Sequence, residues 1–120
     1  MKKIPINIWD DYYDDGYVPS DEIQETYIYV EDHKMPLDER KKHLEDFLEI
    51  IKDMVDKDVK LWIELYDSKL KYPNLIGPEY ETMHFKRWEI KVQHLTHENR
   101  EKLVKKLKNM DTPYNVYSES

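Results

Sequence analysis

The sequence contains no Cys, and this absence excludes several kinds of chemistry. Without a thiol there is no thiol catalysis, no thiolate metal site and no disulfide framework. A reducing compartment suits such a chain, so we expect a cytoplasmic location. Glycine is also scarce, with two in 120 residues. The sequence therefore has no Gly-rich phosphate-binding loop.

Long apolar runs are missing as well. No stretch approaches the roughly 18 apolar residues of a membrane span, and no secretory signal follows the initial Met. None of the Ser residues lies in a nucleophile elbow. We therefore expect no membrane association, no enzymatic activity and no cofactor.

What the chain has in abundance is charge, mainly acidic. The formal net charge is −7, from 26 acidic against 19 basic residues, and charged residues make up 38% of the chain. Nucleic acids and anionic membranes repel an acidic protein at long range. Nucleic acid is therefore an unfavoured partner.

Two hydrophobic periods alternate along the chain. A period of two residues predicts strands, and a period of 3.6 residues predicts amphipathic helices. The two helices are expected at 37–55 and 100–110, the second one capped by Thr96. The strands are expected at 3–9, 25–31, 59–66 and 85–95, and 112–120 is either an edge strand or a tail.

This order of elements resembles the ferredoxin-like βαββαβ plait, preceded by one extra strand. We expect one α+β domain over residues 1–120, with an antiparallel sheet of four or five strands and both helices on one face. The strands at 25–31 and 85–95 would be central neighbours. Either the amino-terminal or the carboxyl-terminal strand would form the edge beside 25–31.

The aliphatic residues of the helices and strands predict one hydrophobic core. In the first helix Leu44, Phe47, Leu48 and Ile51 recur on one face. Ile63 lies on the aliphatic side of its strand. Replacing Ile63 or Leu48 by Ala is expected to cost on the order of 2–5 kcal/mol.

Aromatic and long charged residues alternate with these aliphatic residues, so they gather on the sheet face away from the helices. Such a face can stack single-stranded RNA, contact a protein or a second copy, or stabilise the sheet through cross-strand pairs. Acidic residues at 31, 64 and 89 on the same face disfavour RNA. The face consists of Tyr27, Tyr29, Trp62, Tyr66, Phe85, Arg87 and Lys91.

The tripeptide Ile28-Tyr29-Val30 is similar to the first strand of an RNA recognition motif. However, the strand at 85–95 lacks the Gly-rich aromatic pattern of that family. We favour contact with an unidentified protein partner or with a second copy. The sequence thus predicts a small acidic interaction module that binds through its aromatic sheet face.

The segment 10–22 is the candidate metal site. Asp11, Asp15, Gly16 and Glu22 occupy positions one, five, six and twelve of an EF-hand-type calcium loop. Tyr13 stands at position three, where a ligand is required. The alternative is an acidic loop that is simply solvated.

The second helix carries the one basic patch of the sequence. Its lysines also suit the carboxyl-terminal end of the helix dipole, so a solvated helix face is one interpretation. The other is docking to an acidic partner, such as the acidic loop of a second copy. The patch consists of Arg100, Lys102, Lys105, Lys106 and Lys108.

Overall fold

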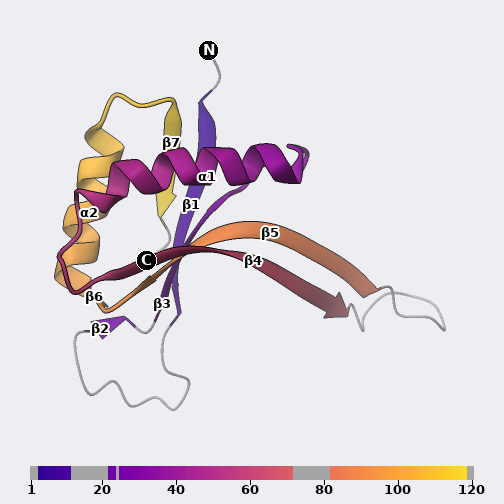
Figure 1. The fold of residues 1–120 in the computed structure, drawn as a ribbon, viewed down its shortest axis with the longest axis horizontal. Coiled ribbons are helices and arrows are strands. Elements are labelled where there is room, and N and C mark those ends of the chain that lie inside the picture. The colour runs from indigo at the N-terminus through magenta and orange to yellow at the C-terminus, as the bar shows by residue number, and fades with distance from the viewer. Residues whose placement is uncertain (1–2, 12–21, 24, 72–81, 119–120) are drawn as a thin grey trace.

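The computed structural model describes residues 3–11, 22–23, 25–71 and 82–118, with the backbone alone for 11, 22–23, 68–71 and 82–85. Seven strands and two helices lie in this part of the chain (Figure 1). The strands are β1 (Ile4–Asp11), β2 (Glu22–Ile23), β3 (Glu25–Val30), β4 (Lys60–Lys71), β5 (Thr82–Gln93), β6 (Leu95–Thr96) and β7 (Tyr114–Ser118). The helices are α1 (Leu37–Lys52) and α2 (His97–Asn109).

Five strands form the main sheet, in the order β4-β5-β3-β1-β7, and β2 pairs with β6 in a separate short sheet. As expected, β3 and β5 are neighbours, and they run antiparallel. The sheet departs from the plait because β1 lies between β3 and β7. It is also mixed rather than antiparallel, since β7 runs parallel to β1. The two edges of the sheet are β4 and β7.

The position of β1 has a simple physical reason. β1 and β3 are close in sequence and pair antiparallel over the whole of β3, from Ile6 opposite Val30 to Asp11 opposite Glu25. This pairing occupies the edge of β3 that a plait offers to its last strand. The outer edge of β1 is then the one available to β7.

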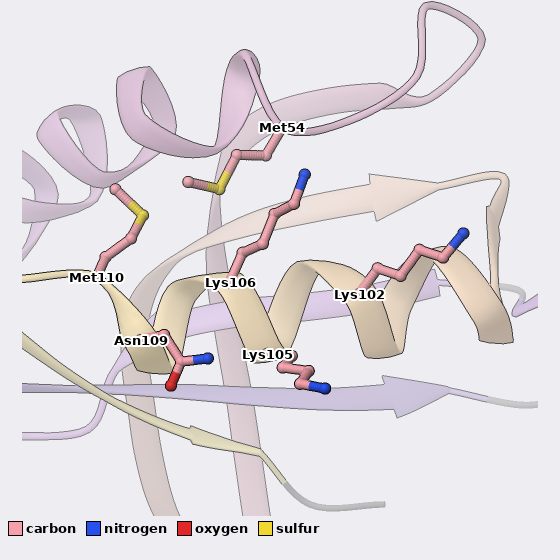
Figure 2. A pocket seen from close by; sticks show the side chains of 6 residues that line it. All are labelled: Met54, Lys102, Lys105, Lys106, Asn109 and Met110. Carbon is pink, nitrogen blue, oxygen red and sulfur yellow. The ribbon is translucent and has the colours of Figure 1, made fainter.

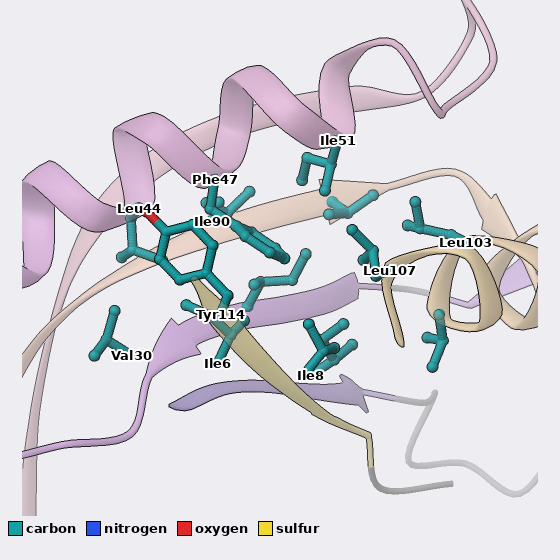
Figure 3. Close-up of a cluster of buried hydrophobic side chains, with 14 of the residues drawn as sticks. Ile6, Ile8, Val30, Leu44, Phe47, Ile51, Ile90, Leu103, Leu107 and Tyr114 are labelled. Carbon is teal, nitrogen blue, oxygen red and sulfur yellow. The ribbon is translucent and has the colours of Figure 1, made fainter. Parts of the chain in front are cut away.

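Both helices pack on the same face of the sheet, as the periodicity predicts. Phe47 and Ile51 of α1 and Leu107 of α2 point toward Ile6 and Ile90 of the sheet (Figure 3). Leu48 and Ile63, which the sequence places in the core, are only partly buried at its border. Ile63 is less buried because β4 is an edge strand.

The connection between β5 and α2 keeps apolar side chains in the core on both sides of a break in the strand. Val92 and Leu95 are both buried although they are three residues apart, which a continuous strand does not permit. His94 has φ = 65° and interrupts the strand between them. α2 then begins as predicted, because the Thr96 hydroxyl accepts a hydrogen bond from the Asn99 N–H at 3.2 Å.

β4 and β5 are longer than predicted and extend beyond the rest of the sheet (Figure 1). β5 pairs with β4 from Thr82 to Gln93 but with β3 only from Glu89 to Val92. The outer half of this hairpin is therefore two strands wide. At its base the Arg40 guanidinium of α1 donates to the Lys86 carbonyl at 3.2 Å.

Candidate functional site

Most described aromatic residues of the sheet lie on the face opposite the helices, as the strand alternation predicts, whereas Trp88 and Tyr114 lie on the helix side. We call Trp9, Tyr27, Tyr29, Trp62, Tyr66 and Arg87 the ring layer. The strand register sets its side chains in cross-strand rows. One row is Trp9, Tyr27, Lys91 and Trp62, the next is Asn7, Tyr29, Glu89 and Glu64, and a third pairs Arg87 with Tyr66.

Contacts among the rings hold this layer in place. The Trp9 and Tyr27 rings stack with centroids 4.6 Å apart. The Arg87 guanidinium lies 4.1 Å from the Tyr29 ring centroid and 4.8 Å from that of Tyr66. Cation–π and stacking contacts of this kind stabilise the arrangement of the side chains. The layer therefore contributes to the stability of the sheet through cross-strand contacts, which is one of the three roles that the sequence predicts for this face.

Exposure is uneven across the layer. Tyr27, Tyr29 and Trp62 are half-buried, whereas Tyr66 is 41% exposed. On the same face, at the β7 edge, Tyr117 is 48% exposed. The ring of Tyr66 is thus the part of the layer most available for contact.

Lys91 and Arg87, the two cations that lie among the rings of the face, are paired with carboxylates. The Lys91 ammonium lies 3.1 Å from the Glu64 carboxylate, which also accepts a hydrogen bond from the Trp62 indole at 3.1 Å. These two hydrogen bonds lower the pKa of Glu64. The Arg87 Nε lies 3.2 Å from the Glu89 carboxylate. Neither cation is free to bind a phosphate.

Glu89 is the most unusual residue of the face, because its side chain is fully buried. Arg87 meets one carboxylate oxygen, and no described residue forms a hydrogen bond with Oε1. Glu89 also lies directly opposite Glu64 in the β4–β5 register. Burial raises the pKa of Glu89, although Arg87 opposes the shift, and the charge of Glu64 raises it further.

Replacing Glu89 by Gln is expected to change how stability depends on pH. Because the pKa of Glu89 is raised in the folded state, its protonation stabilises the fold as pH falls toward the ordinary value of 4.5. This contribution is lost as pH rises through the folded-state pKa. The Glu89→Gln protein should therefore gain stability relative to the native protein between acidic and neutral pH, as measured by urea unfolding at several pH values.

Glu64→Gln is the matched control, since the two carboxylates face each other across one strand pair. The pKa of Glu64 is lowered, so its stabilising contribution is present above 4.5 and is lost at lower pH. The two variants should therefore differ from the native protein with opposite pH trends. A stability difference for Glu89→Gln that does not change with pH would contradict the raised pKa of the buried carboxylate.

Several sequence-predicted site residues cannot be placed. Asp15 lies outside the described residues, and so do the side chains of Asp11, Glu22 and Phe85. The proposed calcium loop is therefore untested. Within the described residues, no group of three His, Asp or Glu side chains gathers to hold a metal ion.

The structure contradicts the predicted place of Arg100 in the basic patch. The sequence assigns it to the basic patch of the second helix, but its side chain is 8% exposed and points into the fold. Its Nε lies 2.5 Å from the Asp10 carboxylate, and its Nη2 donates to the Ser118 hydroxyl at 2.6 Å. The Thr26 hydroxyl donates to the same carboxylate at 2.8 Å. No local sequence signal distinguishes this buried arginine from the exposed lysines around it.

Neither α1 nor α2 is long and apolar enough to cross a membrane. No protein-family model, curated protein or solved structure matches this chain. The geometry of the ring layer is therefore the feature that bears on function.

Proposed function

We propose that this protein is a small interaction module without enzymatic activity. Its ring layer would contact a protein partner or a second copy of the chain. The observation that carries the proposal is an ordered aromatic surface that neither α1 nor α2 covers, with Tyr66 41% exposed. We keep the cytoplasm as its proposed location, because a reducing compartment suits a chain without Cys.

The order of the ring layer favours binding. Association costs free energy when flexible side chains must be immobilised at an interface. Tyr29 and Tyr66 are already held by the Arg87 guanidinium, and Tyr27 by Trp9. Tyr, Trp and Arg are also the residues that contribute most to protein interfaces. The layer therefore combines suitable residue types with a low entropic cost.

The charges of the face favour a protein over nucleic acid. Lys91 and Arg87 are each paired with a carboxylate, at 3.1 and 3.2 Å. Binding of a nucleic-acid backbone depends on cations that are available to phosphate. The face offers rings, but the two cations that lie among them are already neutralised.

Tyr66→Ala tests the proposal, with Leu65→Ala as its matched control. The two residues are adjacent in β4 and similarly exposed, at 41% and 43%. They lie on opposite faces of the strand, and only Tyr66 belongs to the ring layer. If the chain binds itself, light scattering at rising protein concentration should show a dimer that Tyr66→Ala weakens and Leu65→Ala preserves.

A protein partner is tested by a photo-crosslinking amino acid placed at position 66 or at position 65. In an extract of the source cells, position 66 should give a discrete crosslinked protein that position 65 does not. The proposal fails if the native chain stays monomeric at high concentration and position 66 gives no product beyond that of position 65.

A further inference from the structure

A second surface lies on the other side of the molecule, at the end of the two helices. There, a hollow of about 570 Å³ lies between the turn after α1 and the outer side of α2 (Figure 2). A smaller hollow of about 210 Å³ adjoins it and shares Met54, Lys102 and Lys106. We call the two together the lysine groove. It is lined mainly by Met54, Lys102, Lys105, Lys106, Asn109 and Met110.

The floor of the lysine groove is apolar. Met54 extends toward α2 from the turn after α1, where its N–H bonds to the Ile51 carbonyl at 2.9 Å. Met110 comes from the end of α2. Both side chains are only partly buried against the core. Methionine is flexible and polarizable, so it adapts to varied apolar partners.

The rim of the groove is positively charged. Lys102 and Lys106 are four residues apart and extend from the same side of α2 (Figure 2). Lys102 forms an ion pair with Glu98 at 3.1 Å. Within the described residues, no carboxylate pairs with Lys105 or Lys106. The one described carboxylate that lines the groove, Asp56 in the smaller hollow, accepts a hydrogen bond from the Asn99 amide at 2.7 Å and forms no ion pair with these two ammonium groups.

The shape of the groove favours a polypeptide over a small molecule. Small-molecule sites enclose most of the ligand surface, whereas this groove is open along one side of α2. From Asn99 to Met110 it follows about 16 Å of helix, which matches about three turns of a partner helix. Helices commonly bind to apolar grooves through one apolar stripe.

We propose that the lysine groove binds an acidic amphipathic helix of a partner protein. An apolar stripe of that helix would contact Met54 and Met110, and its flanking carboxylates would pair with Lys105 and Lys106. A nucleic acid would meet the lysines but leave the methionine floor unmatched, and the net charge of −7 would repel it. This surface is separate from the ring layer, so the inference is independent of the proposed function.

The test uses a fluorescein-labelled, Ala-based helical peptide of about 14 residues with one Leu stripe flanked by Glu. Fluorescence anisotropy should show saturable binding to the native chain that weakens as salt rises. The same peptide with Gln in place of Glu should bind at least about tenfold more weakly.

Lys106→Glu and Lys108→Glu form the matched pair of variants. Both lysines lie in the last turn of α2 and both changes alter the net charge equally, but only Lys106 lines the groove. Lys106→Glu should weaken peptide binding by about tenfold or more, and Lys108→Glu should change it little. Met54→Gln, which keeps the side-chain length, should also weaken binding. Melting curves would verify that each variant is folded.

Tyr66→Ala should bind the peptide as the native chain does, because Tyr66 lies on the ring layer. The inference is overturned if the peptide does not bind, or if Lys106→Glu and Lys108→Glu weaken it equally. It is also overturned if the chain binds phosphatidylserine vesicles but not the peptide. A loss of peptide binding in folded Tyr66→Ala would likewise exclude the groove as the binding site.

Discussion

Arg100→Ala is expected to destabilise the fold by about 3–5 kcal/mol. Arg100 and Asp10 are buried, with side chains 8% and 2% exposed, and their charged atoms lie 2.5 Å apart. Removing the guanidinium takes away the cation that faces the buried Asp10 carboxylate, and the neutral Thr26 hydroxyl, which donates to that carboxylate, does not replace the charge. An uncompensated buried charge costs far more than an exposed ion pair contributes. Urea unfolding of the two proteins measures the difference.

Lys102→Ala is the control on the same helix, because its ion pair with Glu98 is exposed. It should change the free energy of unfolding by less than about 1 kcal/mol. The double variant Asp10→Ala/Arg100→Ala should lose less stability than the sum of the two single variants. Additive losses would show that the two residues do not act as a pair.

Phe47→Ala is expected to cost about 3–5 kcal/mol. Phe47 is 1% exposed at the centre of the core, and its ring meets Tyr114 edge to face at 5.4 Å (Figure 3). Truncation removes this contact and leaves a cavity between α1 and the sheet. Thermal or urea unfolding of the purified variant provides the measurement.

Leu48→Ala is the control at the neighbouring residue, because the sequence predicts that Leu48 is a core residue whereas the structure places it at the border of the core. The periodicity places Leu48 on the same helix face as Phe47, yet Leu48 is only partly buried. Its truncation should therefore cost clearly less than that of Phe47. Equal losses for the two variants would mean that the core extends further along α1 than the structure places it.

The aromatic face and the helix stripes were predictable because they follow from local geometry. Alternate residues of a strand point to opposite faces, so the aliphatic set at Ile28 and Val30 leaves Tyr27 and Tyr29 on the other side. The Thr96 cap was predictable for the same reason, since its hydrogen bond reaches only three residues along the chain.

The sheet order could not be predicted in this way. β1 and β7 each have one apolar face, so either strand could form backbone hydrogen bonds with the free edge of β3. The outcome is decided by competition between a pairing that is near in sequence, β1 with β3, and one that is distant, β7 with β3. In the structure β1 takes that edge and β7 pairs with β1 instead.

The burial of charged residues was equally hidden. Arg40, Glu89 and Arg100 are all less than about one-tenth exposed, although their residue types are usually found at the surface. Each is buried by elements that are remote in the sequence. Arg100 is buried, unlike the lysines of α2, because it pairs with Asp10, which lies 90 residues earlier in the chain.

The sequence alone determined the two helices, the longer strands β1, β3, β4 and β5, and the side of each that carries apolar or aromatic residues, because these depend on repeats of two or 3.6 residues. Only the tertiary structure decided the order of the strands, the burial of Glu89 and Arg100, and the position of Met54 beside the lysines of α2. Those features depend on which distant segments meet, and no local pattern encodes that choice.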